Sequence, residues 1–256
     1  MTTIPDLAQK RVLITGASTG IGAAAARAFA AAGCRVALHY NASREAAEGV
    51  AADIRARGGE AHLVQGDVRD SATVRRIVED GVRALGGLDV LVNNAGGLVK
   101  RVPVAEIDDA VFDEIVDLNV RSLVVATAAA VPHLRKSKGG AIINVTSIAA
   151  RHGGGPGAAL YASSKGFVST FTRGIARELA GENIRVNAVS PGVIATPFHE
   201  RYSTPQMLET MRLTIPMARL GTADECAGTF LYLASGTLSG YVTGQVVEVN
   251  GGQLMP

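Results

Sequence analysis

The sequence predicts a single α/β domain, a doubly wound parallel sheet with helices on both faces. Seven short apolar runs alternate with helical segments along the 256 residues. The first run passes through a glycine-rich turn into an alanine-rich helix. No repeat, low-complexity linker or charge run marks a second domain. Residues 1–256 are therefore expected to form one domain, and right-handed crossovers leave few topologies for it.

The expected elements follow in order along the chain. Strands are predicted at 11–15, 36–39, 62–65, 89–93, 141–146, 184–189 and 246–249. Helices are predicted at about 23–32, 44–57, 72–85, 109–134, around Tyr161 and at 223–234. Val74, Ile77 and Val78 share one face of the third helix, and Ser71 is its expected N-cap. Residues 196–218 are less regular and amphipathic, which favours a small lid over a substrate or, equally, a permanently packed helix pair.

Composition excludes several classes of function. The net charge of +2 offers no large electrostatic footprint for nucleic acid. No apolar run free of charges is long enough for a membrane span, and the N-terminus does not read as a signal peptide. Cys34 and Cys226 lack C-x-x-C spacing, which indicates reduced thiols in a cytoplasmic protein. The five histidines show no metal-ligand spacing, so no metal site is predicted.

The turn after the first strand suits a nucleotide. Its spacing is G-x-x-x-G-x-G, from Gly16 through Gly20 to Gly22. Gly16 can make a tight turn, Gly20 lets the backbone approach a ligand, and Gly22 lets the helix pack near the strand. Free N–H groups and the dipole at the helix start attract a pyrophosphate. This spacing differs from the G-x-G-x-x-G of many dinucleotide sites, so the turn is weak evidence alone.

Other polar or flexible segments follow strands and are expected at the same edge of the sheet. They are Asp67-Val68, Asn93–Gly97, Ser147 and Pro191-Gly192. Asp67 is a candidate acceptor for an adenine amino group, with Val68 against the ring. The alternative is an aspartate that only closes a turn.

Tyr161 and Lys165 are four residues apart and would leave one face of a helix together. A tyrosine has a pKa of about 10, and a nearby cation lowers it by roughly 1–3 units, which makes the phenol a better base. Ser147 ends a predicted strand, where its hydroxyl can hold a substrate oxygen beside Tyr161. Taken alone, this spacing is also typical of an ordinary amphipathic helix.

These motifs occur together in one known family. The segment Thr15–Gly22, Asn93–Gly96, Asn119, Ser147, Tyr161 with Lys165, and Pro191-Gly192 with Thr196 stand in its order and spacing. The sequence resembles the short-chain dehydrogenase/reductase family over essentially the whole chain, and the 3-oxoacyl-carrier-protein reductase branch most closely. The resemblance implies a Rossmann-type dinucleotide-binding and catalytic domain.

The resemblance also implies roles for individual residues. Tyr161 would exchange a proton with the substrate oxygen, Lys165 would stabilise the phenolate and hold the ribose, Ser147 would bind the substrate oxygen, and Asn119 would complete a proton relay to solvent. Cofactor contacts are expected from Gly16, Ser18, Thr19, Gly20, Ile21, Tyr40, Asn41, Ser43, Arg44, Asp67, Val68, Asn94, Ala95, Gly96, Tyr161, Lys165, Pro191, Gly192, Ile194 and Thr196.

The end of the second strand bears on the choice of cofactor. It reads Leu38–Arg44 and holds no acid to bind a ribose 2′-hydroxyl and repel a 2′-phosphate. Ser43 and Arg44 offer a hydroxyl, a cation and a helix start, which favour NADP(H) over NAD(H). Two points keep NAD(H) as the alternative. Family members that prefer NADP often carry a basic residue where this chain has Thr19, and Arg44 can equally be a solvated helix start.

The sequence thus predicts an oxidoreductase that transfers a hydride between NADP(H) and a small-molecule carbonyl or secondary alcohol. An NAD-dependent polyol or sugar dehydrogenase is the alternative, and a non-catalytic dinucleotide-binding regulator is a third hypothesis. The glycine-rich loop within 149–159 is expected to form a wall of the substrate site with little side-chain bulk. The resemblance further implies a homotetramer.

Overall fold

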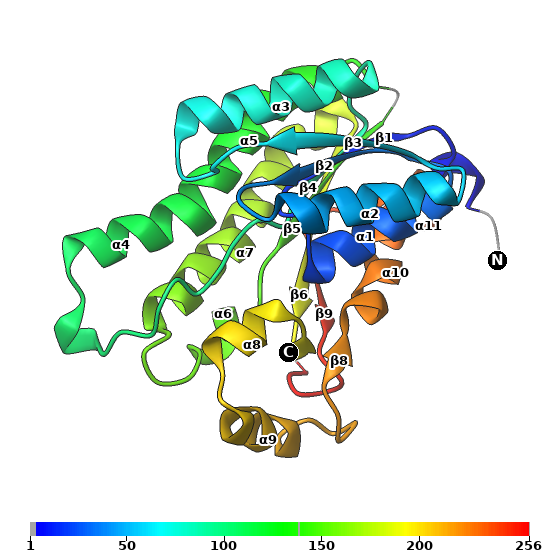
Figure 1. Ribbon diagram of the computed structural model, residues 1–256. Helices are drawn as coiled ribbons and strands as arrows, with labels where there is room; N and C mark the ends of the chain where they lie inside the picture. The colour runs from blue at the N-terminus through cyan, green and yellow to red at the C-terminus, as the bar shows by residue number, and fades with distance from the viewer. Residues whose placement is uncertain (1–3, 138, 256) are drawn as a thin grey trace.

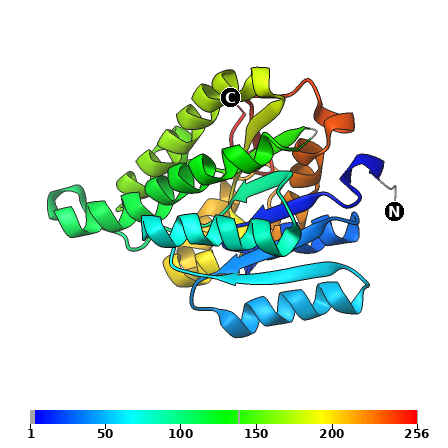
Figure 2. The ribbon, with the colours of Figure 1, turned by 90° about the horizontal axis from the view of Figure 1, so that it is seen from above.

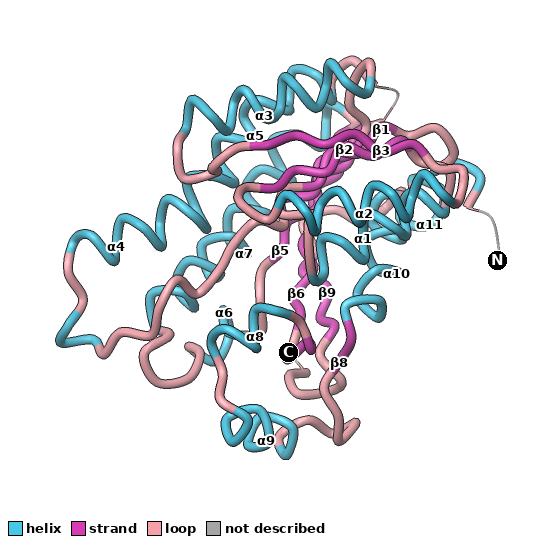
Figure 3. Tube along the Cα trace, viewed as in Figure 1, coloured by secondary structure: helices cyan, strands magenta, loops and turns pink. Residues whose placement is uncertain are grey.

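The computed structural model describes residues 4–137 and 139–255. Its centre is a seven-stranded sheet in the order β3-β2-β1-β4-β5-β6-β9, in which all neighbours are parallel (Figures 1 and 3). The strands are β1 (Arg11–Ile14), β2 (Arg35–Tyr40), β3 (Glu60–Gln65), β4 (Val90–Asn93), β5 (Gly140–Val145), β6 (Ile184–Pro191) and β9 (Val246–Val249). The predicted parallel sheet is confirmed. Because the strand order reverses between β1 and β4, a ligand crevice is expected at the carboxyl ends of these two strands.

Helices cover both faces of the sheet (Figure 2). On one face α1 (Gly20–Ala31), α2 (Arg44–Ala56) and α10 (Ala223–Ala234) enclose a buried cluster that includes Phe29, Val50 and Phe230. On the other face α3 (Ser71–Leu85), α5 (Ser122–Leu134) and α7 (Ala159–Leu179) enclose a second cluster with Ile77 and Ala130. The strands are apolar on both sides because both faces are covered, which is why they read as continuous apolar runs.

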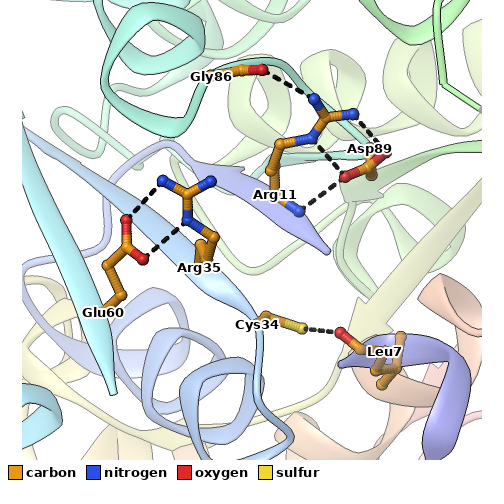
Figure 4. A network of polar contacts seen from close by, with 7 residues as sticks. All are labelled: Leu7, Arg11, Cys34, Arg35, Glu60, Gly86 and Asp89. Carbon is orange, nitrogen blue, oxygen red and sulfur yellow. Dashed lines mark hydrogen bonds and ion pairs between the residues drawn. The ribbon is translucent and has the colours of Figure 1, made fainter. Parts of the chain in front are cut away.

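Two arginine–carboxylate pairs tie the strands together at their amino ends (Figure 4). Arg11, at the start of β1, donates to both carboxylate oxygens of Asp89 and to the carbonyl of Gly86. Arg35, at the start of β2, makes a bidentate pair with Glu60 at the start of β3. Both pairs therefore stabilise the amino ends of the strands, which lie opposite the expected crevice.

The long helix predicted at 109–134 contains a local break in its α-helical pattern. It consists of α4 (Asp109–Val116), a π-helical turn at Asp117–Arg121 and α5. By length and apolar composition alone, the whole stretch meets the measure for a membrane span, as core helices also do. In this fold α5 packs on α3, and the π turn carries the buried polar side chain of Asn119.

The N-cap of α3 is one residue earlier than predicted. The side chain of Asp70 accepts a hydrogen bond from the backbone N–H of Thr73 at 2.7 Å, and Ser71 is the first helical residue. Both Asp and Ser are good N-caps. The extended backbone of Asp70 decides which of the two takes that position.

The less regular segment after β6 is built from short elements. β7 (Ile194–Ala195) pairs with β8 (Gly221–Thr222), and α8 (Pro197–Tyr202) and α9 (Pro205–Leu213) lie between them. Figure 1 shows α8 and α9 projecting at the end of the molecule opposite α3. The remaining short helices are η1 (Pro5–Leu7), η2 (Val104–Glu106), α6 (Ala149–His152), η4 (Ala180–Glu182) and α11 (Gly236–Ser239).

Candidate active site

A cleft of about 900 Å³ opens at the carboxyl ends of the strands. Every residue predicted to bind the cofactor lines it, with the exception of Arg44. Ser147, Tyr161 and Lys165 line the same cleft, whereas Asn119 is buried behind it. Residues that are far apart in the sequence therefore meet at the predicted edge.

The glycine turn has the backbone that its sequence implies. Gly16 and Gly20 have φ values of +65° and +54°, which disfavour residues with a side chain. A Cβ on Gly22 would lie 2.2 Å from the carbonyl oxygen of Gly16, so the helix can approach the turn only because Gly22 lacks one. The side-chain amide of Asn94 donates to the carbonyl of Gly16 at 2.8 Å and fixes the turn to the end of β4.

Two buried residues for which the sequence predicted no role, His39 and Thr15, organise this turn. The Nδ1 atom of His39 accepts from the N–H of Gly16 at 3.1 Å, and its Nε2 donates to the carbonyl of Gly66 at 3.0 Å. Burial lowers the pKa of His39, in keeping with a neutral ring. The Thr15 hydroxyl accepts from the N–H groups of Asn94 and Ala95, each at 3.0 Å. No local pattern reveals these contacts, because each one joins different strands.

Tyr161 and Ser147 form the reactive end of the cleft. Ser147 follows β5, and Tyr161 lies in the first turn of α7. The two side chains share a hydrogen bond, and the Ser147 hydroxyl also accepts from the N–H of Ala149 at 3.1 Å. The ring of Phe198, from α8, lies 5.8 Å from that of Tyr161. A carbonyl oxygen placed beside Tyr161 would therefore lie near the hydroxyl groups of Tyr161 and Ser147, with the ring of Phe198 close by.

Lys165 is almost fully buried below Tyr161, with its Nζ donating to the carbonyl of Val145 at 2.9 Å. The distance from Nζ to the centre of the Tyr161 ring is 5.8 Å. The Thr146 hydroxyl donates to the backbone carbonyl of Lys165 at 2.8 Å and anchors α7 to the end of β5. Helical spacing therefore puts the two side chains on one face, as predicted.

The predicted direction of the Tyr161 pKa shift is wrong. Burial raises the pKa of Tyr161 to about 12, although the hydrogen bond with Ser147 acts to lower it. Burial also lowers the pKa of Lys165 to about 8. Spacing alone indicated a nearby cation, but it did not indicate that the packing around Tyr161 desolvates the phenol, and desolvation outweighs the other effects.

Asn119 holds the loop that follows β4. Its Nδ2 donates to the carbonyls of Gly97 and Ile115 at 2.9 and 3.0 Å, and its Oδ1 accepts from the N–H of Gly97 at 3.0 Å. A Cβ on Gly96 would lie 2.8 Å from this Oδ1 and 3.0 Å from the Lys165 Nζ. Asn119 and Lys165 thus converge on one glycine, and the π turn supplies the geometry.

The far end of the cleft departs from prediction at Arg44. Its guanidinium pairs with Glu48 on the same exposed helix face at 2.8 Å and does not line the cleft. Ser43 does line the cleft, and its hydroxyl makes no capping bond to α2. Both carboxylate oxygens of Asp67 are already bound by Arg69, at 2.6 Å in the shortest contact.

The known proteins that match this chain over nearly its whole length include several reductases. The family model described as enoyl-(acyl carrier protein) reductase matches residues 16–253. A 3-oxoacyl-[acyl-carrier-protein] reductase from Synechocystis sp. is 40% identical over 247 residues, covering 95% of this chain and 96% of that protein. The corresponding reductase from Staphylococcus aureus is 37% identical over 246 residues, covering 96% of this chain and 98% of that protein.

Solved structures are similar over nearly the full length as well. An NADH-dependent reductase, A1-R′, responsible for alginate metabolism has a TM-score of 0.90 and 39% sequence identity, covering 98% of this chain and 99% of that one. A short-chain dehydrogenase from Burkholderia cenocepacia in complex with NADP has a TM-score of 0.90 and 34% identity, covering 97% and 99%.

Proposed function

The chain belongs to the short-chain dehydrogenase/reductase family, and we propose that it transfers a hydride between NADP(H) and a carbonyl or secondary alcohol, with Tyr161 as general acid and base. Family membership makes it an NAD(P)-dependent oxidoreductase. The observation that carries the finer proposal is the cluster of Ser147, Tyr161 and Lys165 at one end of a cleft whose other end is the glycine turn.

The residues present fit a dinucleotide. Gly16, Gly20 and Gly22 line the cleft where α1 begins and carry no side chain, so the backbone N–H groups of the turn can approach a pyrophosphate. Asn94, Ala95 and Gly96 would hold the middle of the cofactor, Lys165 its ribose, and Ile194 with Thr196 its carboxamide. The nicotinamide supplies or accepts the hydride when bound.

The protein's own groups handle the proton. With its pKa raised to about 12, Tyr161 is protonated at neutral pH and gives its proton to the carbonyl oxygen as the carbon gains the hydride. Ser147 donates a hydrogen bond to the same oxygen. The ammonium of Lys165 favours the phenolate that remains. The alcohol leaves, and the reverse order of these events oxidises it.

Replacement of Tyr161 by Phe tests this assignment. Tyr161→Phe removes the proton donor and little volume, so turnover should be lost while the Kd for NADPH stays within about twofold. Tyr241→Phe is the matched control because Tyr241 is fully exposed. Steady-state turnover and cofactor titration on both variants give the answer, and retained activity in Tyr161→Phe would refute the assignment.

The choice of NADP(H) rests on the end of β2. Tyr40, Asn41 and Ser43 line the cleft there, and no acid does so before α2. An exposed pair such as Arg44–Glu48 stabilises a protein little, so Arg44 is free to turn toward a 2′-phosphate. Arg44→Ala should lower kcat/KM with NADPH about tenfold and leave the value with NADH unchanged.

An NAD(H)-dependent reaction on a sugar-like substrate is the second candidate. It is favoured by the likeness to a reductase described as NADH-dependent and responsible for alginate metabolism. Comparison of kcat/KM for NADPH and NADH on the unmodified protein separates the two. A higher value with NADH would replace the NADP(H) proposal and leave the role of Tyr161 intact.

Three further features belong to the proposal. Residues 196–218 act as a substrate lid, since Phe198 and Tyr202 of α8 line the cleft. The chain works in the cytoplasm as a homotetramer, and the assembly is supported by the exposed ring of Phe167, which stacks on the half-buried ring of Phe171 on α7. Sedimentation would test the assembly, and a monomer would contradict it.

A further inference from the structure

Basic side chains gather at the substrate end of the cleft. The cations Lys100, Arg101 and Arg201 line it together with two histidines, His152 and His199. The acids that line the cleft within the described residues are Asp67 and Glu114, and both pair with Arg69 at the other end. The part of the cleft near Tyr161 therefore offers an anion several cations and, within 4–137 and 139–255, no competing carboxylate.

Arg101 is held where two walls of the cleft meet, α8 and the glycine-rich loop. Its Nε donates to the carbonyl of Tyr202 in α8 at 3.2 Å, and one terminal nitrogen donates to the carbonyl of Pro156 in the glycine-rich loop at 2.9 Å. Carbonyl contacts neutralise no charge. A guanidinium has five N–H donors, so three remain without a partner among the described residues.

The backbone before Arg101 is strained. Val99 has a φ of +65°, which is rare for a β-branched residue, and the N–H of Lys100 donates to the carbonyl of Leu98 at 2.8 Å. The result is a tight γ-turn directly before Lys100 and Arg101. Backbone strain of this kind persists where the surroundings enforce it, and it gathers at ligand-binding sites.

His199 lies close to Arg101. Burial lowers the pKa of His199, and the positive charge of Arg101 lowers it further. Its Nδ1 is within 3.0 Å of the Ser203 hydroxyl. The ring of His199 meets that of Phe198 edge-on at 5.2 Å, and Phe198 in turn covers Tyr161. The rings of His199 and Phe198 therefore lie between Arg101 and Tyr161.

We propose that Arg101 is a specificity-determining residue that binds a carboxylate of the substrate, so that the substrate is an oxo acid whose ketone lies at Tyr161 and Ser147. This inference rests on the proposed reductase function and adds the substrate class. A planar guanidinium that presents several N–H donors in a fixed fork matches a carboxylate better than a lysine does. The same contact would join α8 to the glycine-rich loop around the bound acid.

Oxo acids compared with their methyl esters test the proposal. The pairs are pyruvate, acetoacetate and levulinate, each with its ester, so that the distance between ketone and carboxylate increases along the series. The unmodified protein should reduce at least one acid with a kcat/KM about tenfold or more above that of its ester. In Arg101→Gln this acid-to-ester ratio should fall by about 10- to 100-fold, the range for a lost hydrogen bond to a charged group.

Two controls separate recognition from structure. Arg75→Gln removes the same charge from an exposed arginine on α3 that also contacts only a carbonyl, and it should leave the ratio unchanged. If Arg101 only clamps the two walls, Arg101→Gln will lower the acid and ester values equally, which would overturn the proposal. Esters reduced as well as acids, or no acid reduced at all, would overturn it too.

If the proposed reductase function itself is wrong, the expected result differs from that of a wrong substrate class. In that case acids and esters are both inert with NADPH and with NADH, and Tyr161→Phe behaves like the unmodified protein. Failure of the substrate class alone leaves the esters active and still dependent on Tyr161.

Discussion

At the scale of residues, burial sets the acid–base chemistry. It raises the pKa of Tyr161 to about 12 and lowers that of Lys165 to about 8. Below pH 8 the phenol is therefore neutral and the amine charged, which is the state that carbonyl reduction needs. Above pH 8 the ammonium is lost first, and with it the charge that favours the phenolate.

The pH profile of carbonyl reduction follows from this order. With saturating cofactor, kcat/KM should be flat below about pH 8 and fall about tenfold per pH unit above it. Lys165→Arg keeps its charge at all these pH values, so its decline should move to higher pH even though its rate is lower. A profile that does not move in Lys165→Arg would assign the ionisation to another group.

The sequence reveals some of these residues and hides others. Spacing was enough to place Tyr161 and Lys165 on one face, because a helical repeat is local. The depth of the site, which reverses the expected pKa shift of Tyr161, comes from the packing of α7 and α8. His39 was also missed, because its bonds to Gly16 and Gly66 join segments distant in sequence.

At the scale of elements, two irregular turns shape the site. The glycine turn was predictable because its backbone demands leave a residue-type signature at Gly16, Gly20 and Gly22. The π turn at Asp117–Arg121 was not, since a single π turn inside a long helix shifts the apolar pattern too little to be recognised. That single turn sets the position of Asn119 and, through it, of Gly97.

A methyl group on Gly22 tests the glycine turn. In Gly22→Ala the new Cβ would meet the Gly16 carbonyl oxygen at 2.2 Å, so the turn must open. We expect a loss of about 1–3 kcal/mol of unfolding free energy and a Kd for NADPH at least about tenfold weaker. Urea denaturation and cofactor titration measure the two effects.

Gly228→Ala is the matched control for that substitution. Gly228 lies in α10, and a Cβ there has no atom within 4 Å. Alanine should stabilise the helix by about 0.5–1 kcal/mol and leave cofactor binding unchanged. Equal behaviour of the two variants would mean that the turn does not depend on the absence of a side chain at Gly22.

At the scale of the whole molecule, the stabilising ion pairs and the candidate active site lie at opposite ends of the strands. The carboxyl ends of the strands surround the cleft, while Arg11 with Asp89 and Arg35 with Glu60 hold the amino ends (Figure 4). The alternation of strands and helices was enough to predict the layers. The pairing of Arg11 with Asp89 was not predictable, because 78 residues separate them.

Asp89→Asn tests whether the fold can be destabilised at the amino ends of the strands without affecting catalysis. Burial raises the pKa of Asp89, but hydrogen bonds from Arg11 outweigh it, so the pKa is lowered overall. The pair therefore stabilises the fold above the unfolded pKa of about 4, and this is lost as pH falls through the lower folded value. At neutral pH the variant should lose about 1–3 kcal/mol in urea denaturation.

The same variant should keep its catalytic parameters. Asp89 does not line the cleft, so kcat and KM should match those of the unmodified protein. The stability difference should also shrink as pH falls below about 4. A constant difference at low pH, or a loss of activity in the folded variant, would contradict this separation.

Transfer of deuterium tests the central claim most directly. NADPH that carries deuterium at the transferable position of the nicotinamide is incubated with an accepted ketone, and the alcohol is analysed by mass spectrometry. We expect one deuterium on the former carbonyl carbon with the unmodified protein, and no labelled alcohol with Tyr161→Phe despite bound cofactor. Unlabelled alcohol from the unmodified protein, or equal labelling by Tyr161→Phe, would contradict the proposed function.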